Sequence, residues 1–309
     1  MKRRTFLYQS LTGCSALVFG SDQSGRIVLD KEMAFQFLGA DQSMDQIILF
    51  SVSKDIESKI SQEANWTFNP DFRPTDAKRH DLGSQTNILV ASHGAIYKVP
   101  YERKDKIFWA ETYPSCHSVE LLPDGNMISA NSNDHQLTLH YNALADGDLR
   151  MKFSDSVDFP FETAHAVVYD RTRNCIWALG SVLGKFTYHV GQHPTLQLID
   201  TFPLPLCHTN GHDLYPHPNG NLLMTTHEGV LEMTIGNFAY PQILSELKDV
   251  KSVVADHHHN IFITDPSDIA GYETWQTDSV INLTDHEILK RKGARFYKVR
   301  LWEKNSFSY

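Results

Sequence analysis

The sequence has too few cysteines to specify a disulfide framework. Four occur in 309 residues, and a small secreted domain held by disulfides would be much richer in them. Cys14 lies near the N-terminus, and the other three, Cys116, Cys175 and Cys207, are an odd number, so at least one stays unpaired. Cys116 and Cys175 fall inside strand patterns, and we expect both to be buried as small apolar side chains.

The chain also lacks basic runs beyond its first four residues, long apolar runs and any long helical period. Its formal net charge is −9, with 28 basic against 37 acidic residues, which argues against nucleic acid or an anionic membrane surface as a partner. We expect no membrane span. The missing helical period argues against alternating strands and helices. The length and the 41% hydrophobic content suit one large all-β domain or two average domains.

The N-terminus carries a targeting pattern. Lys2-Arg3-Arg4-Thr5-Phe6-Leu7 resembles the twin-arginine export signal, and a short apolar run follows it. We expect cleavage near Gly20, a leader over 21–33, a single domain over 34–309 and a periplasmic or secreted protein. A basic tail on a cytosolic protein is the alternative. Acylation of Cys14 as a lipoprotein is less favoured, because the apolar run continues beyond it.

A strand-turn-strand pattern recurs along the chain. Its clearest copy covers 116–131, where Pro-Asp-Gly-Asn separates two apolar runs and Gly125 can take the positive φ that such a hairpin turn demands. Further copies cover 164–180, 211–226, 251–265 and, more weakly, 79–92.

The spacing of these copies predicts the fold. Their key positions are 80, 117, 165, 212 and 252, so the steps are 37, 48, 47 and 40 residues. Units of about 40–50 residues with four short strands each are typical of propeller blades. With an N-terminal unit added, the prediction is an all-β, six-bladed β-propeller. Five or seven blades, a β-sandwich or two small β domains are the alternatives, and no YWTD or WD signature is present.

Propeller geometry predicts where the repeated histidines meet. The first strand of a blade lines the central channel, and its start lies at the same face as the end of the second strand. Imidazoles from separate blades suit a divalent transition metal such as zinc or manganese. The predicted metal ligands are His80, His117, His165, His212 and Asp41. His93 and His227, at second-strand ends, would transfer protons. The alternative is a polar channel lining that bonds to backbone and trapped water.

Other polar and aromatic residues are expected at the same face. Trp275 and Gln276 lie in a long loop over 266–278, where a flat ring beside polar groups makes a sugar platform, although Trp275 could instead cap the core. With Arg79 and Asn131 they form the predicted substrate-binding set.

A histidine cluster at the channel mouth of an exported propeller resembles the oligogalacturonate lyases and related polysaccharide lyases. The resemblance implies a histidine-held divalent metal that binds a substrate carboxylate. We therefore expect a monomeric, exported, metal-dependent lyase or hydrolase acting on a small molecule or oligosaccharide. A non-catalytic propeller that binds a glycan or another ligand is the alternative.

Overall fold

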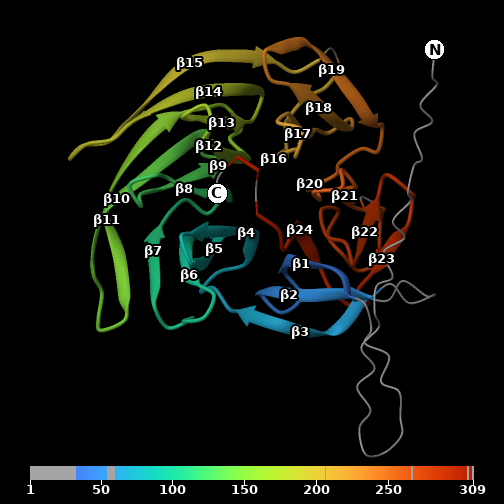
Figure 1. Cartoon of the computed structure of the whole chain (residues 1–309), viewed down its shortest axis with the longest axis horizontal. Helices are drawn as coiled ribbons and strands as arrows, with labels where there is room; N and C mark the ends of the chain where they lie inside the picture. The colour runs from blue at the N-terminus through green and yellow to red at the C-terminus, as the bar shows by residue number, and fades with distance from the viewer. Residues whose placement is uncertain (1–32, 54–59, 206, 266, 305, 308–309) are drawn as a thin grey trace, which may run out of the picture. The chain divides into compact units, whose positions relative to one another are not determined.

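The computed structural model describes residues 33–53, 60–205, 207–265, 267–304 and 306–307, within a compact unit that spans Met33–Tyr309. All regular structure in these ranges is β-strand (Figure 1). No helix among them has the length and apolar character of a membrane span. The predicted export signal and leader lie outside the described residues.

The described strands form six antiparallel four-stranded units. The first three units are β24-β1-β2-β3 (Phe296–Leu301, Met33–Asp41, Gln46–Ser53, Ile60–Phe68), β4–β7 (Pro74–Leu82, Gln85–Ser92, Ala95–Pro100, Ile107–Glu111) and β8–β11 (Cys116–Leu121, Met127–Asn131, Gln136–Ala145, Arg150–Pro160). The other three are β12–β15 (Ala166–Asp170, Cys175–Leu179, Val182–His189, Thr195–Pro203), β16–β19 (Asp213–Pro216, Leu222–Thr225, Val230–Thr234, Asn237–Ser245) and β20–β23 (Val253–Ala255, Ile261–Thr264, Ser279–Asn282, Ile288–Lys290).

These units form a closed ring, as Figure 1 shows. Their innermost strands contact one another in the order β24, β4, β8, β12, β16, β20 and back to β24. The last strand, β24, pairs antiparallel with β1, so the two ends of this unit share one sheet. Two units are also joined at the rim, because β7 pairs with β11 in parallel and makes one eight-stranded sheet. The predicted all-β propeller is confirmed.

The hydrophobic core lies between neighbouring units rather than at the centre of the ring. Each of five buried clusters combines side chains from adjacent sheets. In one of them Phe37 and Phe50 of the first unit pack with Phe262 of the sixth. Because each sheet is covered by its neighbours on both faces, its strands read as nearly continuous apolar runs.

The hairpin patterns were predicted correctly except for the register of one. Gly125 has a φ of 89°, as the turn between β8 and β9 requires. The weakest copy was misread, because β4 begins at Pro74, six residues before the predicted start at His80. The first half of this buried strand carries Asp76 and Lys78, and buried charges are rare unless they are paired.

A buried ion network explains those charges. The Arg300 guanidinium on β24 contacts Asp76 of β4 at 2.9 Å and Asp213 of β16 at 2.5 Å. The Lys298 ammonium lies 3.1 Å from Asp213, and Lys78 lies 3.5 Å from a carboxylate on β8. The innermost strands are therefore tied together by paired charges along the axis of the ring.

Candidate functional site

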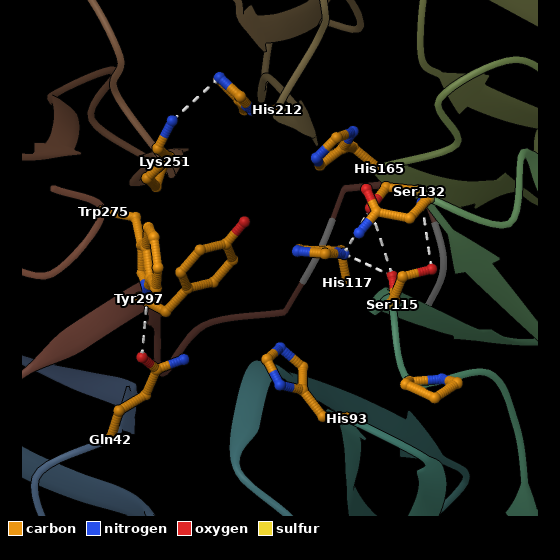
Figure 2. A pocket seen from close by; sticks show the side chains of 12 residues that line it. Gln42, His93, Ser115, His117, Ser132, His165, His212, Lys251, Trp275 and Tyr297 are labelled. Atoms are coloured by element: carbon orange, nitrogen blue, oxygen red, sulfur yellow. Dashed lines mark hydrogen bonds between the residues drawn. The ribbon is translucent and has the colours of Figure 1, made fainter. Parts of the chain in front are cut away.

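A cavity of about 320 Å³ opens where the innermost strands begin (Figure 2). Seven of its lining residues lie just before those strands or at their second position, so the closure of the ring brings them together. Twelve described residues line it, none of them acidic: Gln42, His93, Pro114, Ser115, His117, Ser132, Asn133, His165, His212, Lys251, Trp275 and Tyr297.

Five imidazoles follow one another around the cavity and its rim. Neighbouring ring centroids lie 6.1 Å apart from His93 to His117 and 4.8 Å apart from His117 to His165. The next separations are 5.2 Å from His165 to His212 and 4.5 Å from His212 to His227. The predicted convergence of His117, His165 and His212 is therefore present, and it includes the two histidines predicted for proton transfer.

Two of these imidazoles have a fixed tautomer. His117 Nδ1 donates to the carbonyl oxygen of Ser115 at 2.5 Å, and His165 Nδ1 donates to that of Thr163 at 2.9 Å. In both cases the acceptor lies two residues upstream, just before the innermost strand. The proton on Nδ1 leaves the Nε2 lone pair free, and Figure 2 shows the far edge of the His117 ring pointing into the cavity.

Three side chains that could hold a metal ion, His212, His227 and Asp249, lie together at the rim. His212 Nε2 is 3.4 Å from His227 Nδ1, which is 2.6 Å from a carboxylate oxygen of Asp249. One ligand atom from each of these residues lies within 4.8 Å of the other two. The Lys251 ammonium occupies the same position, because it donates to His212 Nε2 at 3.0 Å and lies 3.6 Å from Asp249.

The imidazoles of the cavity are held neutral. Burial lowers the pKa of His117 and of His212, and burial lowers the pKa of His165 to about 4. Neighbouring imidazoles and the Lys298 ammonium add repulsion against a further positive charge. Burial also lowers the pKa of the Lys251 ammonium, opposed by Asp249. At neutral pH the cavity therefore presents uncharged imidazoles with free lone pairs rather than imidazolium ions.

Gly211 allows His212 to reach its position. A Cβ atom on this glycine would lie 2.3 Å from Cγ of Leu179, a fully buried side chain. The Gly211 amide donates to the carbonyl of Gly180 at 2.9 Å, and the His212 amide donates to that of Thr225 at 2.8 Å. A close approach between two units thus fixes the backbone that carries His212.

The structure does not bring His80 to the cavity. His80 pairs with Asn87 near the far end of β4, whereas Pro74 pairs with Ser92 beside His93. Six residues of strand span about 20 Å. The prediction that His80 joins the other histidines is therefore wrong, and Thr75 occupies the corresponding position next to β8.

Asp41 and Arg79 also lie outside the cavity lining. The Asp41 carboxylate accepts hydrogen bonds from the amides of Ser43 and Arg295, both at 2.9 Å, and so ties two loops together. The Arg79 guanidinium lies 3.0 Å from Asp81 and donates to the carbonyl of Trp302. Both predicted roles, metal ligand and substrate contact, are thus replaced by structural ones.

Of the three remaining predicted residues, Trp275 lines the cavity, whereas Gln276 and Asn131 do not. Trp275 lines the cavity, is 37% exposed, and its indole nitrogen lies 3.4 Å from Gln42 Oε1. Gln276 is buried and donates to the same oxygen at 2.9 Å. Asn131 is fully buried and bonds to Thr138 within its own sheet. Gln276 therefore positions the wall, and Asn131 stabilises a strand pair.

Histidine alone marked the predicted site, so the prediction did not include Lys251, Asp249 and Tyr297. Lys251 lies two residues before β20, whereas His165 and His212 each lie one residue before their strands, so the repeated position in this unit is Ser252 and not Lys251. Tyr297 lies on β24, whose pairing with β1 across the ends of the chain is a long-range feature.

The fold and cavity define a class: a β-propeller with a histidine-lined pocket at one mouth of its channel. The chain belongs to the family of unknown function DUF6528, whose model matches residues 41–309. No functionally curated protein matches the chain.

Similar solved structures support the same fold. A protein of unknown function from Bacteroides caccae matches with a TM-score of 0.56 and 12% identity, over 88% of this chain and 100% of its own. A chain of a nidogen/laminin complex gives the same TM-score, identity and coverage. A candidate 6-phosphogluconolactonase from Bacteroides uniformis matches with a TM-score of 0.50 and 11% identity, over 86% and 84%. These neighbours share the propeller fold.

Proposed function

We propose that this cavity is the active site of a metal-dependent lyase or hydrolase that acts on a small molecule of the carbohydrate type. The observation that carries the proposal is the row of neutral imidazoles. In two of them, His117 and His165, Nδ1 donates to a backbone carbonyl, so the lone pair is on Nε2. Such tethering gives a general base a fixed orientation. A similar fold in a candidate lactonase is compatible with an enzyme.

The rim residues fit a divalent ion such as zinc or manganese. His212 Nε2 and His227 Nδ1 are 3.4 Å apart, close to the spacing of about 3.3 Å between two ligands at about 2.0–2.1 Å on a tetrahedral ion. Asp249 supplies a negative charge at the same position. A metal ion there would replace the hydrogen bond between His227 Nδ1 and Asp249 and move the Lys251 ammonium aside.

Each group then has a distinct role. The metal, when bound, supplies a Lewis acid for a substrate oxygen. His165 lies between His117 and His212 in the row and takes a proton on Nε2. For a lyase that proton comes from carbon, and for a hydrolase it comes from water. Trp275 offers its exposed ring to a sugar face. The cavity volume is near the lower end of the range for ligand sites, about 300–1,000 Å³, which favours a small substrate.

The test combines metal analysis with turnover. Purified protein is stripped with a chelator, reloaded with zinc or manganese, and assayed on glycosides, uronates and aldonolactones for unsaturated or hydrolysed products. We expect His212→Ala to lose both metal and activity and His165→Gln to lose activity while it keeps the metal. His189→Ala, an exposed histidine on β14, is the matched control. Full activity in the metal-free protein contradicts the metal role.

One observation favours the alternative of a non-catalytic binding propeller. The Lys251 ammonium already satisfies His212 and Asp249, so the pocket is complete without a metal. In that case Trp275→Ala would weaken sugar binding strongly and His165→Gln only modestly, and no product would appear with or without metal. Binding isotherms for the two variants therefore distinguish the two functions.

A further inference from the structure

Tyr297 lies in the cavity wall opposite the imidazoles, and its hydroxyl forms no hydrogen bond among the described residues. Tyr297 lies on β24 and is only 6% exposed, so its ring is part of the packed wall. Among the residues that the structure describes, no hydrogen-bond partner is found for its hydroxyl, although that hydroxyl belongs to a residue lining the cavity. A phenol donor left in this way is available to a ligand.

The position of this hydroxyl complements the imidazoles. The rings of Tyr297 and His117 are 5.5 Å apart and tilted by 53°. Figure 2 shows the Tyr297 hydroxyl and the free edge of His117 pointing into the same space, with Lys251 and His165 beyond them. One side of the cavity therefore offers hydrogen-bond donors, Tyr297 and Lys251. The other side offers acceptors on His117 and His165.

The neighbouring polar groups do not share this availability. The Gln42 amide donates to the carbonyl of Pro74 at 3.0 Å and accepts from Gln276. The Ser115 hydroxyl donates to Asp134 at 2.5 Å. Burial raises the pKa of Tyr297, with Asp213 and Asp76 adding to the effect, so the phenol stays protonated at all working pH values. It is a permanent donor, unlike an imidazole.

We propose that Tyr297 is a catalytic residue whose hydroxyl donates a hydrogen bond to the substrate oxygen on which negative charge develops. The proposal deepens the proposed function and rests on it, and it defines the substrate as a small polyhydroxylated molecule with a carbonyl or carboxylate oxygen. In a lyase step the C–H bond beside that group breaks and His117 or His165 takes the proton on Nε2. The electron pair moves toward the oxygen held by Tyr297 and then expels the leaving group. No oxidant or reductant is needed.

Tyr297→Phe is the appropriate variant, because it removes the hydroxyl and keeps the ring. Tyr215→Phe is the matched control, since Tyr215 is also 6% exposed on an innermost strand but does not line the cavity. On whichever substrate the wild type turns over, Tyr297→Phe should lower kcat by about 10²–10³-fold, a larger loss than the change in KM. A ring that only packs would leave kcat unchanged, and that result overturns the proposal.

A binding measurement separates this proposal from the proposed function. D-glucuronate and D-glucose share a ring and differ in the carboxylate. Each is titrated by calorimetry against the wild type, Tyr297→Phe and Tyr215→Phe. We expect Tyr297→Phe to weaken glucuronate binding by about 10-fold and to leave glucose binding nearly unchanged. Equal glucuronate affinity in wild type and Tyr297→Phe overturns the role of Tyr297. Absence of any turnover in the wild type, together with the expected loss of binding, refutes the enzyme and keeps Tyr297 as the donor to the ligand.

Discussion

Replacing Arg300 by methionine tests whether the axial ion network holds the ring together. The guanidinium makes four contacts of 2.5–3.1 Å with Asp76 and Asp213, and all three side chains are almost completely buried. Without it, Asp213 keeps the ammonium of Lys298 at 3.1 Å, and Asp76 loses its contacts with a guanidinium at 2.9 and 3.1 Å. Removing one partner of a buried ion pair costs about 3–5 kcal/mol. The melting temperature should fall by about 6–20 °C at 2–4 °C per kcal/mol.

The pH dependence makes this prediction specific. In the wild type Arg300 is the largest influence that opposes burial, and the pKa of Asp213 is lowered to about 2, below the unfolded value of about 3.9. Its stabilisation is therefore present above about pH 4 and is lost as the pH falls through about 2. In Arg300→Met burial is opposed less strongly, since Lys298 remains, so the pKa of the Asp213 carboxyl rises and its protonation lessens the loss of stability.

Unfolding in urea, followed by circular dichroism at pH 7 and pH 4.5, measures the difference between the two proteins. We expect the deficit of Arg300→Met to be largest at pH 7 and smaller at pH 4.5. Arg103→Met, which removes an exposed pair with Asp105, should have no measurable effect. A deficit below about 1 kcal/mol, or one that does not change with pH, would refute the reasoning.

Three further predictions follow from the site, the core and the N-terminus. Gly211→Ala should destabilise the fold by about 1–3 kcal/mol and lower activity by displacing His212, measured by urea unfolding and turnover; unchanged activity contradicts the packing argument. Burial lowers the pKa of His140 to about 4, below the unfolded value of about 6.5, so its stability contribution is lost as the pH falls from 6.5 to 4. His140→Gln should make stability less sensitive to pH in that window. Arg3→Lys with Arg4→Lys should block export, and processed protein in the periplasmic fraction would disprove the signal.

The sequence was sufficient to predict the class of fold because the signal was repeated. Turn chemistry at Gly125 and the spacing of about 40–50 residues between hairpins recur, so several weak local patterns supported one architecture. A single strand with unusual chemistry was misread. β4 carries Asp76 and Lys78 in its buried half, and their partners lie on other units, at positions that local patterns do not reveal.

The candidate site could be predicted only at the positions where histidine recurs from one unit to the next. His117, His165 and His212 share a register and therefore meet at one mouth. The prediction for His80 was wrong, because a shift of six residues along a strand moves a side chain from one end of the channel toward the other. Tyr297 was not predictable in this way, since its place at the cavity depends on a strand that closes the ring.

The distribution of charge determines where a cation would bind in this site. Burial, the neighbouring imidazoles and the Lys298 ammonium disfavour any added positive charge on His117, and no acidic side chain is among the described residues that line the cavity. At the rim, Asp249 supplies a carboxylate within reach of His212 and His227. In the proposed function, a divalent ion would therefore be favoured at the rim and disfavoured at the cavity centre. The tethered imidazoles would then stay free to act as bases beside a Lewis acid.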